Sequence, residues 1–238
     1  MSVAHHVAEY LRATREKGLQ ERTVQAASRA VLDWMGATVA GAVLPPARIL
    51  TDVLVPAGGD GAPDSGLVVD GRRTSARNAA LINATASHTV EMDDIYRDGI
   101  YHPGSPTVAA ALAVAQQLHR SGRDFLTAVA LGYEVGGKLA ALLQPAHYRY
   151  WHTTGTVGTV GAAAAVATLL ELDEERTAHA LATATTMASG LQQAFRSDSM
   201  SKPLHAGHAA EAGTLAALAA GQGFTGALDV LEGAAGLA

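Results

Sequence analysis

The feature of this chain that most restricts its fold is its alanine content. Alanine makes up roughly a fifth of the 238 residues, far above ordinary usage, whereas aromatic residues make up 5%. Alanine has the highest intrinsic helix propensity, and its small side chain lets helices approach one another closely. With 48% hydrophobic and 16% charged residues, the chain can bury a sizeable core, which excludes an intrinsically disordered protein. The composition therefore predicts an all-α fold rather than a β-sandwich.

Apolar residues recur at helical spacing along most of the sequence. Two helices are expected before Gly41, with Gly18 between them, and the Pro45-Pro46 pair precedes a short helix. Ser75 is expected to cap the next helix. The later helices are expected over residues 74–88, 105–118, 124–143, 153–170, 174–194 and 203–220.

One segment departs from the helical pattern. Leu67-Val68-Val69 followed by Asp70-Gly71-Arg72 is typical of a strand entering a turn and predicts a small β-hairpin, and the run 57–63 before it is expected to be a loop. No stretch of disordered composition divides the chain, so residues 1–238 are expected to form one domain. The chain ends in an apolar Gly/Ala-rich run, and we expect another region to complete the fold.

Charge and composition also restrict the partners. A net charge of −5 argues against a nucleic-acid partner, and the absence of cysteine excludes disulfides and thiol chemistry, which fits the cytoplasm. The first residues lack the pattern of a secretory signal. The longest uncharged stretch, 150–170, has the length of a membrane span, but it is rich in Thr, Gly and Ala. We expect a buried helix there and no association with a membrane.

Polar residues that could carry chemistry gather in three breaks between the expected helices, and the first is acidic. It places Glu91, Asp93 and Asp94 within four residues, with His88 before them and His102 after them. Adjacent carboxylates repel, so at least one is expected to be hydrogen-bonded or to have a raised pKa, which serves proton transfer or metal binding. Alternatively, the segment is a solvated acidic loop that caps the next helix.

A metal is the competing functional interpretation of this acidic break. Its oxygen ligands would suit magnesium, and His88 or His102 together with Asp93 and Asp94 could suit zinc or manganese. The spacing, however, matches no established metal motif. Our prediction is a site without a metal.

The second break precedes the helix expected at 153–170. Residues 150–158 bring hydroxyl groups and free backbone N–H groups to a helix N-terminus, which suits an anion. His152 would stand at that terminus, where imidazolium is disfavoured, so a neutral histidine able to act as a base is expected. Alternatively, His152 packs against Trp151 and the threonines cap the helix.

The third break, residues 196–208, leads into another expected helix. Pro203 is expected to be its first residue, which places Ser201 or Lys202 at the cap. A lysine is unfavourable at the positive end of a helix dipole, but it is tolerated where an anion is bound or where a lowered pKa is useful. His205 follows one turn into the helix. Alternatively, Lys202 is a solvated lysine that precedes a helix by chance.

Together the three breaks predict two helix N-termini that face an acidic loop carrying histidines. This arrangement suits a substrate with a carboxylate group and side chains that remove a proton from it. The sequence has no phosphate-binding loop, dinucleotide fingerprint, G-x-S-x-G or H-E-x-x-H motif.

The same segments carry a resemblance to a known family. They are Ala27–Gly41, Ala79–Asp94, His102-Pro103, Leu131–Val135, Trp151–Thr156 and Ser201–Gly207. In them, and in order from about Ala4 to Gly233, the sequence resembles the MmgE/PrpD family, which includes 2-methylcitrate dehydratase, cis-aconitate decarboxylase and iminodisuccinate epimerase.

The resemblance implies an all-helical domain with a separate α+β lid, the site lying between them, and a homodimer. It implies chemistry without metal or organic cofactor, in which a proton is removed beside a carboxylate or acyl group and water, carbon dioxide or only the proton leaves. By motif position, His152 corresponds to a catalytic histidine and Lys202 to a lysine that is catalytic or binds the substrate carboxylate. His102 matches the histidine of a His-Pro pair, and Asp93 is expected to act with it. The expected substrate-binding residues are Glu91, Asp94, Thr153, Ser201 and His205.

The sequence departs from the family pattern in the acidic loop and in length. Glu91 stands in place of an aspartate, Met92 of an aromatic residue and Ile95 of a threonine, which leaves the reaction type open. Family chains are much longer, and the lid is expected to be absent from this chain. We therefore expect a lyase or isomerase acting on a small carboxylate as one half of a split enzyme, or with a dimer partner closing the site. A non-catalytic binding or scaffold subunit is the alternative.

Overall fold

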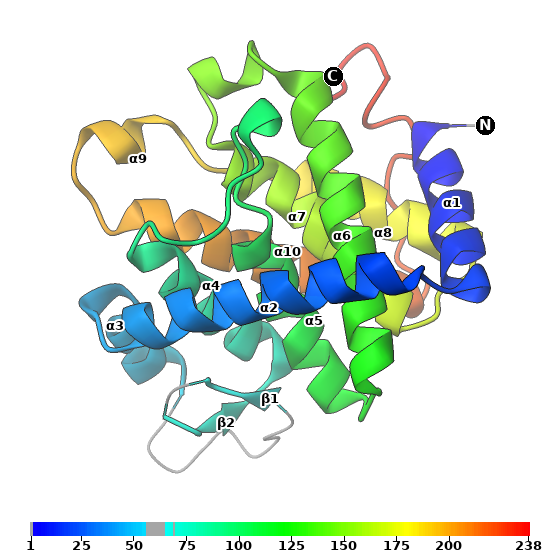
Figure 1. Cartoon of the computed structure of the whole chain (residues 1–238). Helices are drawn as coiled ribbons and strands as arrows, with labels where there is room; N and C mark the ends of the chain where they lie inside the picture. The colour runs from blue at the N-terminus through cyan, green and yellow to red at the C-terminus, as the bar shows by residue number, and fades with distance from the viewer. Residues whose placement is uncertain (1, 56–64, 69) are drawn as a thin grey trace.

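The structure, a computed structural model, describes residues 2–55, 65–68 and 70–238. In this part of the chain it consists of helices and one two-stranded antiparallel sheet (Figure 1). The helices are α1 Val3–Lys17, α2 Glu21–Ala42, α3 Pro45–Leu54, α4 Ala76–Thr89, α5 Gly104–Gln117, α6 Gly122–Leu143, α7 Thr153–Leu169, α8 Glu174–Met187, α9 Gln193–Arg196 and α10 Ser201–Gly221. The strands are β1 Ser65–Gly66 and β2 Arg73–Thr74, and short 3-10 turns cover Arg97–Gly99 and His147–Arg149.

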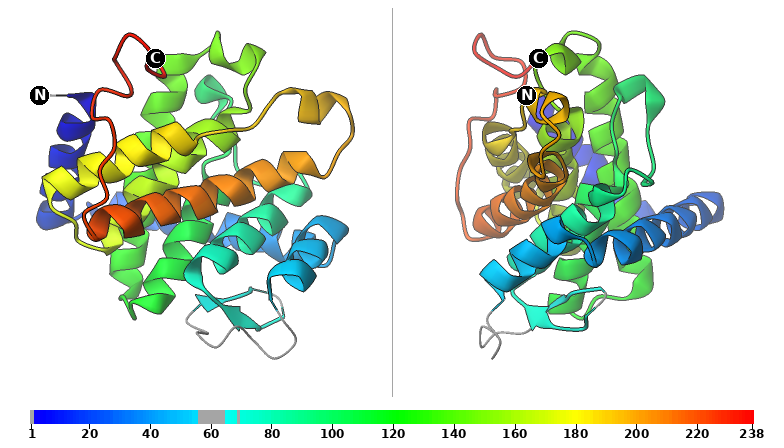
Figure 2. Two further views of the ribbon diagram at one scale, coloured as in Figure 1. Left: turned by 180° about the vertical axis from the view of Figure 1, so that it is seen from behind. Right: turned by 90° about the vertical axis from the view of Figure 1, so that its left-hand side faces the viewer.

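Helix α7 forms the centre of the domain, and every one of its residues is buried. It packs against α6 on one side and α10 on the other, and α8 and α10 lie side by side behind it (Figure 2). Its small residues let the neighbouring backbones come close: a Cβ atom added to Gly213 of α10 would lie 2.5 Å from the Thr159 carbonyl oxygen. The alanine-rich sequence therefore forms the closely packed all-α core that its composition predicts.

Local signals place most helix ends as expected. Gly18 ends α1 with φ +78°, and the hydroxyl of Ser75 accepts a hydrogen bond from the Asn78 N–H at the start of α4. Ser121 and Asp124 form a reciprocal capping box at the start of α6. The predicted helical fold with a small hairpin is confirmed.

Two helix boundaries are corrected by tertiary contacts. The helix predicted to reach about residue 194 ends at Met187, because the following segment extends and pairs with the segment before α7. There the His152 N–H donates to the Gly190 carbonyl oxygen at 2.9 Å, and the Gln192 N–H donates to the Tyr150 carbonyl oxygen at 2.9 Å. Helix α10 starts at Ser201 with Met200 as its cap, so Lys202 is its second residue rather than its cap.

The hairpin is shifted outward from its predicted position. Ser65 pairs with Thr74 and Gly66 with Arg73, while the Leu67 N–H donates to the Arg72 carbonyl oxygen at 2.8 Å. Leu67 and Val68 therefore lie between the strands rather than in one. Val69 and the predicted loop 57–63 lie outside the described residues.

The uncharged stretch 150–170 forms the buried helix that was expected, and it is shorter than a membrane span. Of the helices in the described ranges, α6 is long and apolar enough to cross a membrane, as is the bent pair of α2 and α3 taken together. Of the apolar stretch of α6, 44% is buried inside the protein. The absence of a membrane partner stays a prediction.

The C-terminal segment after α10 runs back toward the N-terminus (Figure 1). The Val3 N–H donates to the Glu232 carboxylate at 3.0 Å, and Leu231 is buried in a cluster with Leu11. Part of the apolar C-terminal run therefore packs within this domain.

Candidate active site

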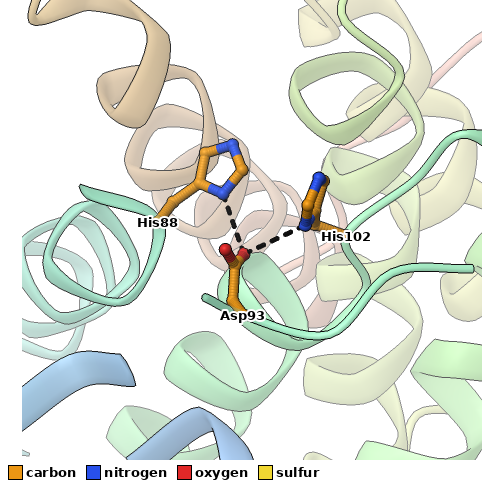
Figure 3. A group of neighbouring side chains, drawn as sticks. All are labelled: His88, Asp93 and His102. Carbon is orange, nitrogen blue, oxygen red and sulfur yellow. Dashed lines mark hydrogen bonds and ion pairs between the residues drawn. The ribbon is translucent and has the colours of Figure 1, made fainter. Parts of the chain in front are cut away.

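A buried carboxylate forms the centre of the acidic loop. Oδ2 of Asp93 accepts hydrogen bonds from His88 Nδ1 at 2.8 Å and from Ser105 Oγ at 2.7 Å, and His102 Nδ1 lies 3.4 Å from the same oxygen (Figure 3). His88 belongs to the last turn of α4, whereas Ser105 belongs to the first turn of α5. The two helices thus close around the loop and hold Asp93 from both sides.

The electrostatics of this cluster favour a charged Asp93. Burial alone would raise the pKa of Asp93, but the hydrogen bonds and positive charge of His102 and His88 lower it well below its usual range. Burial likewise opposes protonation of His102, yet the Asp93 carboxylate raises the pKa of His102 above its ordinary value. The pair is therefore suited to hold a proton on His102 near neutral pH.

His152 stands at the N-cap of α7, as predicted, and is 2% exposed. Its ring stacks on His88 with centroids 5.4 Å apart and meets the edge of Phe195 at 4.5 Å. Burial lowers the pKa of His152 far below its usual range, and the neighbouring imidazoles of His88 and His205 lower it further. His152 is therefore a neutral imidazole, which is the form that can act as a base.

His205 lies behind His152, on the first turns of α10. Nδ1 of His205 is 3.1 Å from Nδ1 of His152. Burial, together with the charge of neighbouring groups, lowers the pKa of His205 to about 4. His205 also lines an open pocket of about 480 Å³ between the 189–199 segment and the start of α10.

Lys202 completes the group from the start of α10. Its ammonium group forms an ion pair with Glu91 and lies 4.7 Å from the centre of the Phe195 ring. Glu91 has φ +55°, a conformation that is uncommon for a residue with a side chain and is found at functional sites. The carboxylate of Glu91 thus occupies the position beside the ammonium group of Lys202.

Three of the predicted site residues lie apart from this group. Asp94 accepts a hydrogen bond from the Gly104 N–H at 3.0 Å, and burial raises its pKa to about 6. Thr153 is buried, and its hydroxyl accepts from Gln144 Nε2 at 2.9 Å. Ser201 is exposed and hydrogen-bonds with Ser199. Their proposed contacts with a substrate stay predictions.

The structure adds residues that the sequence did not single out for the site. His88, considered only as a metal ligand, is the fully buried link between Asp93 and His152. Its position at the end of a helix, five residues before Asp93, is the one signal that could have identified it. Phe195, which contacts both Lys202 and His152, lies between the helix expected to reach about residue 194 and the break at 196–208, and no motif in the sequence pointed to its role.

The geometry also bears on the metal interpretation. Ligand atoms of His88, Asp93 and His102 lie within 4.8 Å of one another, so these three side chains could together hold a cation. Oδ2 of Asp93, however, already accepts hydrogen bonds from His88 and Ser105. A metal bound to Nδ1 of His88 would replace the first of these hydrogen bonds, whereas Oδ1 of Asp93 has no hydrogen-bond partner in the described part of the chain.

Taken together, the site brings a neutral imidazole, a lysine and an imidazole–carboxylate pair to one side of the domain. His102 is joined to the start of α7 because its N–H donates to the Thr154 hydroxyl at 3.2 Å. Such a set can bind an anion, remove a proton from a neighbouring carbon and return a second proton.

Comparison with known proteins identifies the family of the chain. The MmgE/PrpD N-terminal domain matches residues 5–238. The cis-aconitate decarboxylase of Homo sapiens is 30% identical over 230 residues, which is 92% of this chain and 46% of that protein. A cis-aconitate decarboxylase-like protein of Aspergillus oryzae is 31% identical over 170 residues, which is 68% of this chain and 35% of that protein. The chain thus spans less than half the length of these relatives.

Proposed function

The chain belongs to the MmgE/PrpD family, and from this premise we propose that it carries the proton-transfer groups of a lyase or isomerase that acts on a small carboxylate without metal or organic cofactor. The observation that carries the proposal is the buried neutral His152 beside the ammonium group of Lys202, since both contact the Phe195 ring. Decarboxylation is the leading reaction, because the relatives named above are called cis-aconitate decarboxylases.

In the proposed mechanism, His152 removes or returns a proton at the carbon next to the substrate carboxylate. Lys202 exchanges Glu91 for that carboxylate and stabilises the enolate-like charge that develops on it. His102, held by Asp93, supplies or relays the second proton.

A second chain that carries the lid, or a second copy of this chain, is proposed to cover the site. Large apolar side chains are exposed around it, on loops that belong to different parts of the sequence: Met92, Ile95, Tyr150, Trp151, Leu191 and Met200. A covered site would exclude water and strengthen each charge interaction within it. We propose a cytoplasmic enzyme without a nucleic-acid or membrane partner.

The direct test is proton exchange. The chain, alone and with its lid-bearing partner, is incubated in D2O with cis-aconitate, 2-methylcitrate or iminodisuccinate, and proton NMR follows the hydrogen next to each carboxylate. Exchange with release of carbon dioxide identifies a decarboxylase, exchange with loss of water a dehydratase, and exchange alone an isomerase. His152→Ala should slow exchange by about 10²–10⁴-fold, the usual contribution of a general acid or base, and a cooperative melting transition should show that the variant is folded.

Binding without exchange would instead support the alternative, a non-catalytic subunit. Isothermal titration with the same three carboxylates detects it. Parental exchange rates in both His152→Ala and Lys202→Ala would show that these residues are structural and that the site is misassigned.

A further inference from the structure

The imidazoles of His152 and His205 are joined through their Nδ1 atoms, 3.1 Å apart, and the two rings are tilted by 53°. A hydrogen bond of this length between two nitrogens holds one proton. If both Nδ1 atoms carried a proton, the two hydrogens would clash. If neither carried one, the two nitrogen lone pairs would repel each other. The tautomers of the two rings are therefore linked: one ring donates from Nδ1 and the other accepts there.

Backbone packing keeps the His205 ring in this position. A Cβ atom on Gly190 would lie 3.2 Å from Nδ1 of His205, and one on Gly155 would lie 3.1 Å from its Cβ. Gly190 has φ +126°, which side-chain-bearing residues rarely adopt, so the ring rests against a glycine in the extended 188–192 segment. The carbonyl oxygen of Gly190, in the same segment, accepts a hydrogen bond from the His152 N–H. This one segment therefore positions both histidines.

We infer that His205 is a positioning residue that sets the protonation of His152, an inference that rests on the function proposed above. When the Nδ1–H of His152 donates a hydrogen bond to Nδ1 of His205, the Nε2 atom of His152 carries a lone pair. In the described part of the chain, Nε2 of His152 has no hydrogen-bond partner, so it is the ring nitrogen left to face a substrate. His205 thereby holds His152 in the tautomer of a base.

The pair can also carry the abstracted proton away. The substrate C–H bond breaks, its electron pair stays on the carbon, and Nε2 of His152 takes the proton. The Nδ1 proton of His152 then passes to Nδ1 of His205, whose Nε2 proton leaves to water in the open pocket that His205 lines. The reverse sequence delivers a proton to the carbon and turns the base into an acid.

The groups around the pair keep a positive charge from staying on it. His88, His205, Lys202 and His102 disfavour the charged form of His152, and His88, His208 and Lys202 disfavour that of His205. A proton taken from the substrate therefore moves on rather than being stored.

Three variants separate the parts of this inference. His205→Asn places an amide near the position of Nδ1, so it can accept from His152 but cannot carry a proton. His205→Phe keeps an aromatic ring at this position but can neither accept a hydrogen bond from His152 nor carry a proton. His179→Ala is the matched control, a histidine substitution outside the pair. Melting curves establish that each variant is folded.

The first measurement does not need activity. Nitrogen-15 NMR of the histidine rings at neutral pH should show a proton on Nδ1 of His152 in the parent, His205→Asn and His179→Ala, and its loss in His205→Phe. The same His152 tautomer in all four proteins would overturn the inference, whatever their activity.

The second measurement uses the exchange assay. His205→Phe should lower kcat at least tenfold with KM within about twofold, because the base is misprotonated while the substrate contacts remain. His205→Asn should recover part of this loss, and His179→Ala should keep the parental rate, because His179 contacts the Gly226 carbonyl oxygen rather than the histidine pair. A tautomer change in His205→Phe with an unchanged kcat would overturn the catalytic role. If the parent shows no exchange at all, the proposed function fails while the NMR result still decides the linkage.

Discussion

At the residue scale, the ion pair of Lys202 and Glu91 is the contact that a substrate carboxylate is proposed to replace. Lys202→Ala should raise KM and lower kcat in the exchange assay, because a carboxylate contact present in both the ground state and the transition state is lost. Glu91→Gln keeps a hydrogen-bonding group but removes the competing negative charge, so KM should fall. A KM that rises in Glu91→Gln would instead mean that the charge of Glu91 holds the substrate.

The pH dependence of stability follows from the buried histidines. Because the pKa of His152 is far below the value of about 6.5 in an unfolded chain, the unfolded state binds a proton below pH 6.5 that the folded state does not. The free energy of unfolding therefore falls as the pH falls below 6.5. His205, with a pKa of about 4, acts in the same direction, whereas Asp94, with a pKa of about 6, binds a proton in the folded state and opposes it.

His152→Asn should remove one of these protons. Urea unfolding of the parent and the variant at several pH values between 6.5 and 5 should give a free energy of unfolding that changes less steeply with pH in the variant, by about 1 kcal/mol per pH unit on average and by about 1.4 kcal/mol per pH unit near pH 5. Equal slopes would mean that His152 is protonated in the folded chain, contrary to its burial.

The proposed mechanism predicts the effect of removing metals. Activity should survive prolonged treatment with EDTA, because the proposed proton transfer uses the side chains of His152, Lys202 and His102 and no ion. Activity that is lost and then restored by zinc or magnesium would assign His88, Asp93 and His102 to a metal site instead.

At the scale of elements, the close packing of α7 against α10 depends on a glycine, Gly213, at the point where the two backbones approach each other. Gly213→Ala should destabilise the domain by about 1–3 kcal/mol, because the added Cβ would lie 2.5 Å from a backbone oxygen that cannot move aside. Gly36→Ala on α2 is the matched control: nothing lies within 4 Å of the added atom, so it should stabilise by roughly 0.5–1 kcal/mol. Urea unfolding of both variants measures the contrast, and equal effects would disprove the close crossing.

The elements also show how far the sequence could predict this protein. Helices and most of their ends follow from periodicity and caps such as Gly18 and Ser75, which are local signals. The end of α8 was predicted too late although Ser189-Gly190 is a local turn signal, and the extended course of 188–192 comes from its pairing with the segment before α7. Local signals likewise predicted His152 and Lys202 at helix starts. The contacts of His152 with His205 and His88 join distant parts of the sequence, so local signals could not predict them.

At the scale of the whole molecule, the chain is expected to associate. Besides the rim of the site, large apolar side chains are exposed on α2 and α3, including Leu32, Val39 and Val53. Light scattering over a concentration series should report a dimer, or a complex with a lid-bearing chain, and an apparent stability that rises with concentration. A monomer at all concentrations with one cooperative melt would contradict this expectation.

The complete burial of α7 has a consequence for how this protein can change over evolutionary time. The helix that presents His152 has no solvent-facing position, so a larger side chain at almost any point along it would strain the core. Met92 and Ile95, on the loop opposite, are mostly exposed and can be replaced at little cost to folding. Under the proposed function, new substrates would be accommodated by substitutions in the loop while His152 stays in place, so that the chemistry would be inherited and the specificity free to diverge.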